Sequence, residues 1–207
     1  MKVYKNFIFD VDGTLIDTFE RSVRSLKKTV KKMKLEPLTK EQIEYHFRAP
    51  FEEFVDLLDV EDKQGFVKNW LAFYRKGKTK YYRGIPEILK LLKKRGAHLA
   101  VVSNRYHNVE GDWEFADIKE YFDTIVFADD VSEPKPAPDS ILQVLQSQSW
   151  KHGETLYIGD TQSDRDCAKA AQVDFALALW GVRNHKLSSE TRLACPLELE
   201  DHCAKNG

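Results

Sequence analysis

The sequence has no long hydrophobic run and few cysteines. None of its apolar stretches approaches the roughly 20 residues that a membrane-spanning helix needs, and Asp10 interrupts the first one. We therefore expect no membrane partner and no secretory signal peptide. The three cysteines are an odd set without metal-ligand spacing (Cys167, Cys195 and Cys203). Such sparse cysteines are typical of ordinary side chains in a reducing compartment, so we expect a cytoplasmic protein.

The sequence also has no surplus of charge of either sign. Its 32 Lys and Arg oppose 33 Asp and Glu, for a formal net charge of −1. Nucleic-acid binders usually have a basic surplus, so we expect no nucleic-acid partner. Hydrophobic residues make up 42% of the 207 residues, which is enough for a sizeable core in one domain or in a domain with a large insertion. The composition does not indicate an oligomeric state.

Five short apolar runs recur along the chain, at residues 6–9 and from residues 97, 124, 155 and 175. Each run is apolar throughout rather than alternating, which is typical of strands covered on both faces. Segments with helical periodicity precede three of the later runs, at residues 85–96, 139–148 and 163–172. This alternation of strand and helix predicts an α/β fold with a doubly wound, Rossmann-like parallel sheet.

Residues 17–82 contain no strand-like run. Apolar residues at steps of three and four form one helical stripe near the start of this segment, through Phe19, Val23, Leu26, Val30 and Met33. Two later stretches repeat the pattern. We therefore predict an inserted all-helical domain at 17–82 and an α/β core formed by residues 1–16 and 83–207.

Polar side chains follow the carboxyl ends of the predicted strands. The first strand is followed by Asp10 and Asp12, and the fourth by Asp160. Ser103 and Asn104 follow the second. In an open α/β sheet, ligands bind at this edge. Two carboxylates one residue apart repel each other unless a cation or a shared proton holds them together, so the set predicts a site rather than a series of ordinary polar loops.

Two further residues fit this edge of the sheet. Lys135 lies in "EPKPAPD", where three prolines stiffen the loop and could hold a cation in place. Asp164 comes one helical turn after Asp160 in "GDTQSD", although it could equally be an N-terminal helix residue that favours the helix dipole. Asp129 and Asp130 also end a strand, and we leave them outside the predicted site.

Four segments occur in order along the chain: "DVDGTLID", "VVSN", "KPAPD" and "GDTQSD". Together they closely resemble the haloacid dehalogenase superfamily, and within it the phosphoglycolate-phosphatase-like hydrolases that have a helical C1 cap inserted after the first strand. The likeness covers residues 1–16 and 83–183. It implies a Mg²⁺-dependent phosphatase that hydrolyses a small phosphorylated metabolite, a phosphate monoester, through an aspartyl-phosphate intermediate.

The resemblance also implies residue roles. It assigns Asp10 as nucleophile and metal ligand, and Asp12 as general acid and then base, with its backbone carbonyl on the metal. Ser103 and Asn104 would bind the phosphate of the substrate. Lys135 would steady both that phosphate and Asp10.

For the remaining two aspartates, the resemblance implies metal binding. Asp160 would ligate Mg²⁺, and Asp164 would be a ligand or would support one. The chemistry agrees, because displacing an alcohol from a phosphate monoester needs an in-line nucleophile, neutralisation of the phosphoryl charge and a proton for the leaving oxygen. A carboxylate can be that nucleophile, and Mg²⁺ prefers a few carboxylates together with water and phosphate oxygens.

The predicted cap departs from these relatives, so the resemblance does not extend to the substrate. Cap specificity loops in such enzymes are often rich in glycine, yet residues 17–82 contain only Gly65 and Gly77. Arg48 in "HFRAPF" and Arg105 just after "VVSN" are candidate specificity residues, although a lone arginine is usually a surface residue.

Three alternative functions remain. A phosphomutase would use the same pair of aspartates. A 2-haloacid dehalogenase of the same fold is disfavoured by Asp12, because a halide leaves without a proton. A non-catalytic binding module would be expected to have lost Asp10 or Lys135, and both are present.

Overall fold

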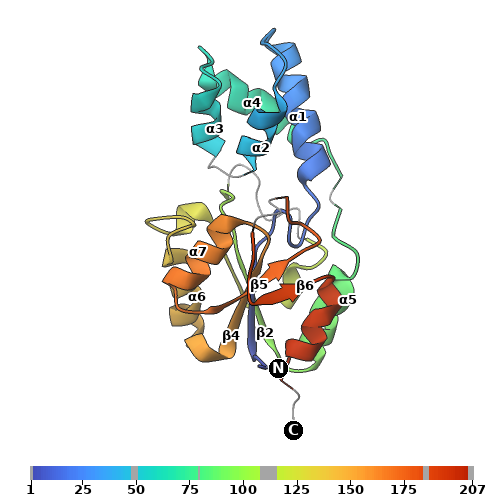
Figure 1. Cartoon of the computed structure of the whole chain (residues 1–207), viewed down its shortest axis with the longest axis vertical. Helices are drawn as coiled ribbons and strands as arrows, with labels where there is room; N and C mark the ends of the chain where they lie inside the picture. Colours follow the sequence, from blue (N-terminus) through green and yellow to red (C-terminus); the bar gives the residue numbers. More distant parts are fainter. Residues whose placement is uncertain (1, 48–50, 79, 108–115, 184–186, 205–207) are drawn as a thin grey trace. The chain divides into compact units, whose positions relative to one another are not determined.

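The chain folds as two compact units, Met1–Asp17 with Lys80–Gly207 and Thr18–Thr79. The computed structural model describes residues 2–47, 51–78, 80–107, 116–183 and 187–204. The sequence predicted the helical segment at 17–82, and the smaller unit found by the structure is a few residues shorter. Figure 1 shows the strands in the first unit and the helices α1 to α4 in the second.

The first unit is built on a parallel sheet. In the part of the chain that the structure describes, the sheet has six strands in the order β3-β2-β1-β4-β5-β6. Their bounds are β1 (Asn6–Phe9), β2 (His98–Val102), β3 (Thr124–Val126), β4 (Thr155–Gly159), β5 (Asp174–Ala178) and β6 (Thr191–Leu193). Five strands coincide with the predicted apolar runs, which confirms the fold class. The sequence did not predict β6, because it is three residues long with an exposed Arg192 at its centre.

Helices cover both faces of this sheet (Figure 1). One face packs against α5 (Ile85–Lys94) and the 3₁₀ helix η5 (Pro196–His202), and the other against α6 (Asp139–Gln148) and α7 (Gln162–Ala170). Side chains of β1 alternate between the two layers, because successive residues of a strand point to opposite faces. The described residues of this unit also form the short 3₁₀ helices η2 (Lys119–Tyr121), η3 (Ala128–Asp130) and η4 (His152–Glu154).

The strand order reverses between β1 and β4. The chain runs from β1 outward to β2 and β3, and then returns to the other side of β1 to form β4. Such a reversal point is where open α/β sheets bind ligands. Asp10 directly follows β1 and Asp160 directly follows β4, so both residues lie at this reversal point.

Where the structure describes it, the second unit is helical, with α1 (Phe19–Lys32), α2 (Lys40–His46), α3 (Phe51–Leu57) and α4 (Lys63–Tyr74). Its core is formed by buried side chains from α1, α3 and α4, among them Leu26, Phe54, Phe66 and Trp70. The predicted apolar stripe at the start of this segment thus lies on α1. Among the described residues, no helix is both long and apolar enough to cross a membrane.

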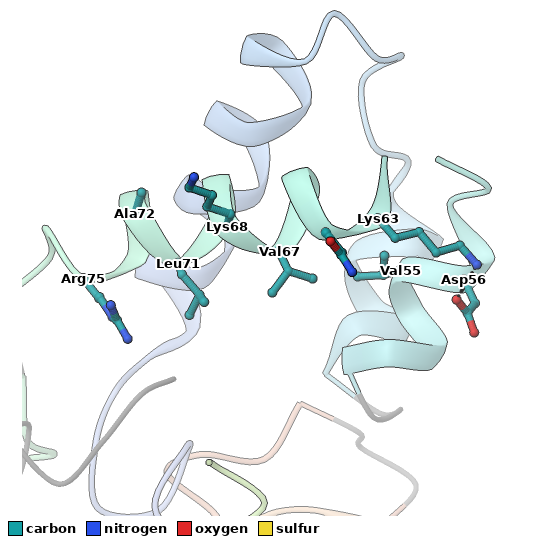
Figure 2. Close-up of a pocket in the computed structure, with 9 residues that line it drawn as sticks. Val55, Asp56, Lys63, Val67, Lys68, Leu71, Ala72 and Arg75 are labelled. Atoms are coloured by element: carbon teal, nitrogen blue, oxygen red, sulfur yellow. Dashed lines mark hydrogen bonds and ion pairs between the residues drawn. The ribbon is translucent and has the colours of Figure 1, made fainter. Parts of the chain in front are cut away.

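A groove lined by α3 and α4 lies within the helical unit (Figure 2). Its volume is about 580 Å³. Val67 and Leu71 lie along it, and its edge carries the cationic side chains Lys63, Lys68 and Arg75. Val67 and Leu71 are partly buried and also pack against the core of the unit, so the groove borders that core.

Candidate active site

A buried lysine joins two of the predicted aspartates. Lys135 Nζ donates hydrogen bonds to Asp10 Oδ1 at 2.6 Å and to Asp164 Oδ1 at 2.7 Å. It also donates to Tyr157 Oη at 3.0 Å. The side chains of Lys135, Asp10 and Asp164 are only 5%, 7% and 1% exposed. Residues from the loop before α6, the end of β1 and the first turn of α7 therefore form one buried ionic cluster.

Asp160 completes a group of three buried carboxylates. Asp10, Asp160 and Asp164 each offer an oxygen, and these atoms lie within 4.8 Å of one another. Thr14 Oγ1 donates a hydrogen bond to Asp160 Oδ1 at 3.2 Å. The structure thus brings together three of the four predicted metal ligands. The fourth, Asp12, is predicted to bind the metal through its backbone carbonyl, and its carboxylate lies outside this group.

The charges in this cluster shift the pKa values of its members. Burial raises the pKa of Asp10 to about 7, with the carboxylates of Asp164 and Asp12 adding to the effect and Lys135 opposing it. Burial and the same kind of repulsion raise the pKa of Asp160 well above its usual value. Burial also acts to raise the pKa of Asp164, but Lys135 and the hydrogen bonds from Thr161 and Tyr157 outweigh it, and the pKa is lowered.

The cluster suits a divalent cation. One ammonium group faces three buried carboxylates, so the protein's own side chains leave an excess of negative charge. Burial raises the pKa of Asp10 and Asp160 most, and the neighbouring carboxylates raise both pKa values further. Carboxylate oxygens are the donors that Mg²⁺ and similar hard cations prefer, and a cation among them would favour the ionised forms. The residues present therefore fit a metal ion.

Arg105 is buried and binds Asp12, which corrects the expectation that a lone arginine lies at the surface. Its side chain is 2% exposed. Nε donates to Asp12 Oδ2 and Nη2 to Asp12 Oδ1, both at 2.7 Å. A buried guanidinium needs such a partner, because an unpaired charge in the interior is costly. No sequence periodicity marks this position, so the pairing could not be predicted.

Ser103 and Asn104 differ in their surroundings. Ser103 is buried at the end of β2, and its Oγ accepts a hydrogen bond from the backbone of Arg105 at 3.2 Å. Asn104 is exposed, and both ends of its amide bind the backbone of Lys135: Nδ2 donates to the carbonyl oxygen at 2.9 Å, and Oδ1 accepts from the amide at 3.0 Å. Asn104 thus holds the Lys135 loop against the end of β2.

The sequence left open whether Asp164 belongs to the site or to the N-terminus of a helix, and the structure places it in both. It is the third residue of α7, where it forms a capping box with Thr161. Its Oδ2 accepts from the Thr161 backbone at 3.0 Å and from Thr161 Oγ1 at 2.5 Å. Its Oδ1 accepts from Lys135 and Tyr157. Asp164 therefore caps the helix and belongs to the carboxylate group at the same time.

Two residues of the site were not predicted from the sequence. Tyr157 of β4 donates its hydroxyl hydrogen to Asp164 Oδ1 at 2.8 Å, and burial raises its pKa, which keeps the hydroxyl protonated. The only sequence signal for it was a tyrosine among apolar residues in a strand that begins with Thr155. Gly181 follows β5, and a Cβ there would overlap the carbonyl oxygen of Gly13. No local pattern marks a close approach between segments so distant in sequence.

We expect Gly181→Ala to impair the site. The added Cβ would overlap the Gly13 carbonyl oxygen and come within 3.1 Å of Asp160 Cβ, so the loops after β1 and β4 must shift. Such overpacking typically lowers the free energy of unfolding by about 1–3 kcal/mol, and a displacement of about 1 Å can reduce turnover roughly 10²-fold. Phosphate release and urea unfolding measure the two effects.

Gly153→Ala is the matched control for this change. Gly153 lies in η4, and a Cβ there would have no atom within 4 Å. Its free energy of unfolding should stay within about 0.5 kcal/mol of the wild-type value, as for other surface substitutions. Equal effects of the two alanines would show that the approach to Gly13 is unimportant.

Arg48, the other candidate specificity residue, lies outside the described residues. Its assignment remains a prediction from the sequence.

The first unit and its carboxylate group define a class of protein, an α/β protein with a parallel sheet and an acidic, candidate metal-binding site at the carboxyl ends of its strands. A family model for haloacid dehalogenase-like hydrolases matches residues 7–178. Phosphoglycolate phosphatase from Aquifex aeolicus (strain VF5) is 33% identical over 182 residues, which cover 84% of each chain. The chain therefore belongs to the haloacid dehalogenase-like hydrolases.

A second curated relative agrees with this family, and a solved structure agrees with the fold. The pyrophosphatase PpaX of Halalkalibacterium halodurans is 29% identical over 185 residues, covering 85% of this chain and 84% of that protein. In three dimensions, a predicted phosphoglycolate phosphatase from Haemophilus somnus 129pt matches with a TM-score of 0.86 at 18% identity, over 97% of this chain and 98% of that one. The protein is thus an enzyme, a hydrolase whose relatives act as phosphatases.

Proposed function

We propose that the protein is a Mg²⁺-dependent phosphatase that hydrolyses a small phosphorylated metabolite through an aspartyl-phosphate on Asp10. The observation that carries this proposal is the buried group of Asp10, Asp160 and Asp164 around Lys135. It combines a candidate nucleophile, a cation that offsets its charge and oxygen donors for a metal.

In the first step, the nucleophile is Asp10. One of its carboxylate oxygens attacks the phosphorus atom, and the bond from phosphorus to the leaving oxygen breaks. Asp12 gives its proton to that oxygen, so the alcohol leaves and Asp12 becomes ionised. Lys135 holds Asp10 through the 2.6 Å hydrogen bond to Oδ1 and balances part of the negative charge. Ser103, at the end of β2, would bind the phosphoryl oxygens.

In the second step, water attacks the phosphorus atom of the aspartyl-phosphate. Asp12, now ionised, accepts a proton from this water. The bond between phosphorus and Asp10 breaks, which releases inorganic phosphate and restores both aspartates. Each aspartate thus has one function in each half of the reaction.

The metal would be held by the carboxylates of Asp10, Asp160 and Asp164 and by the backbone carbonyl of Asp12. A bound divalent cation supplies charge neutralisation, so that a carboxylate can approach a phosphate dianion. In this proposal Asn104 acts through Lys135, since its amide binds the Lys135 backbone on both sides.

The relatives support a small phosphorylated anion as the substrate. Phosphoglycolate and pyrophosphate are named for proteins similar to this one, and both are small phosphorylated anions. We propose that the helical unit serves as a cap that contacts the part of the substrate beyond the phosphate, with Arg48 as one of its contacts. A phosphomutase would need the same two aspartates. Phosphate release from a panel of monoesters and pyrophosphate identifies the preferred substrate, and a phosphomutase would release no net phosphate from its substrate.

We expect activity to depend on a divalent cation. Three buried carboxylates and a substrate phosphate repel one another, and Lys135 alone does not offset this repulsion. Phosphate release from p-nitrophenyl phosphate should disappear when the enzyme is treated with a chelator, and it should return when Mg²⁺ is added in excess. Undiminished release in chelator-treated, metal-free buffer would overturn the metal requirement.

A further inference from the structure

Asp12 is held by Arg105 through both of its carboxylate oxygens. The guanidinium donates from Nε to Oδ2 and from Nη2 to Oδ1, each at 2.7 Å. The two partners differ in exposure, because the side chain of Arg105 is 2% exposed and that of Asp12 is 40% exposed. The arginine therefore lies behind the aspartate, and the aspartate is the member of the pair that faces solvent.

This contact restricts the orientation of the Asp12 carboxylate. Two parallel N–H···O bonds from a planar guanidinium fix both the position and the plane of a carboxylate, which a single point donor does not. The backbone of Arg105 is itself held on both sides: its amide donates to Ser103 Oγ at 3.2 Å, and its carbonyl accepts from the Ala128 amide at 2.9 Å. Asp12 is thus tied to the end of β2, where Ser103 lies.

We propose that Arg105 is a positioning residue that orients Asp12 for proton transfer. This inference rests on the proposed function, in which Asp12 protonates the leaving oxygen and then accepts a proton from water. Each Asp12 oxygen has a second lone pair beside the one that faces Arg105, and the transferred proton is carried there. Arg105 itself has almost no accessible surface for a substrate. Its contribution therefore passes through Asp12, in contrast to the specificity role that the sequence suggested.

The proposal makes the effect of Arg105 depend on the leaving group. A nitrophenolate is weakly basic and departs without a proton, so the first step with p-nitrophenyl phosphate needs little help from Asp12. An alkoxide needs the proton, and the hydrolysis of the aspartyl-phosphate needs the base. A general loss of structure at the site would instead slow every substrate and every step alike.

Arg105→Met and Arg105→Lys test this expectation in the Mg²⁺-loaded enzyme. With p-nitrophenyl phosphate, Arg105→Met should lower kcat about 10²-fold, the loss typical of a displaced catalytic group, and leave kcat/KM largely unchanged. With glycerol 2-phosphate, both kcat and kcat/KM should fall. Arg105→Lys keeps the charge without the paired contact, so it should lie between Arg105→Met and the wild type. Arg192→Met, at an exposed position on β6, is the control for loss of an arginine.

A double-mutant cycle with Asp12→Asn makes the test independent of small losses in stability. If Arg105 acts through Asp12, Arg105→Met should cause no further loss of kcat once Asp12 is changed. If the losses of kcat caused by the two substitutions multiplied in the double mutant, the positioning role would be overturned. An equal fall in kcat/KM for both substrates would overturn it as well. Absence of turnover by the wild-type enzyme on both substrates would overturn the proposed function, and the positioning role with it.

Discussion

Asp10→Asn is expected to abolish turnover of every phosphate ester. The amide of asparagine is a poor nucleophile, and without the Asp10 carboxylate no acyl phosphate forms, so both halves of the reaction stop. The variant should still fold, because asparagine is nearly isosteric and removes one charge from a cluster with excess negative charge. Phosphate release from p-nitrophenyl phosphate and from glycerol 2-phosphate measures the loss.

Asp174→Asn is the matched control for this change. Asp174 lies at the start of β5, at the opposite end of the strand from the candidate site. Its carboxylate forms a surface ion pair with Lys2 at 2.5 Å. Exposed pairs of this kind are worth about 1 kcal/mol or less. Its activity should equal that of the wild type. Substantial turnover by Asp10→Asn, after exclusion of deamidation to aspartate, would contradict the assignment of the nucleophile.

Lys135→Met is expected to reduce both activity and stability. The ammonium group of Lys135 is the partner of Asp10 and Asp164, and all three side chains are buried. Removing one member of a buried ion pair leaves an uncompensated charge, which typically costs about 3–5 kcal/mol. The free energy of unfolding in metal-free buffer should fall by about this amount. Turnover in Mg²⁺ should also fall, because Asp10 loses the contact that holds it.

Lys151→Met provides the comparison for Lys135→Met. The side chain of Lys151 is 79% exposed, and its ammonium lies 3.8 Å from Glu154. Such a surface pair contributes little, so the control should unfold at the urea concentration of the wild type. If Lys135→Met matched Lys151→Met in stability and in turnover, Lys135 would not hold the cluster together.

The sheet could be predicted because its strands have a strong local signal. A strand covered by helices on both faces is apolar throughout, and it ends where polar residues begin. The runs that became β1, β2 and β4 carried Asp10, Ser103 and Asp160 at their ends for this reason. Once the strand order places β1 beside β4, these ends converge without further information. β6 had no such signal, since its three residues include an exposed arginine.

The contacts between side chains could not be predicted in the same way. Arg105 looked like a surface arginine because a single basic residue after a strand has no periodicity to show that it is buried. Asn104 was predicted to bind the phosphate, which stays a prediction, but the contact of its amide with the backbone of Lys135, 31 residues away, could not be foreseen. Tyr157 and Gly181 belong to the site through contacts that only the packed fold creates. Local sequence specifies which groups reach the edge of the sheet, but not how they pair there.

The most direct test of the account is to locate the phosphate on a trapped intermediate. Asp12→Asn keeps the nucleophile and removes the base, so its aspartyl-phosphate should accumulate, hydrolysing roughly 10²–10⁴-fold more slowly than in the wild type. The variant would be mixed with p-nitrophenyl phosphate and Mg²⁺, quenched in acid and digested, and the phosphorylated peptide sequenced by mass spectrometry. The account predicts a burst of nitrophenol equal to the enzyme concentration and phosphate on Asp10. Phosphate on another residue, or steady turnover without a phosphorylated peptide, would contradict it.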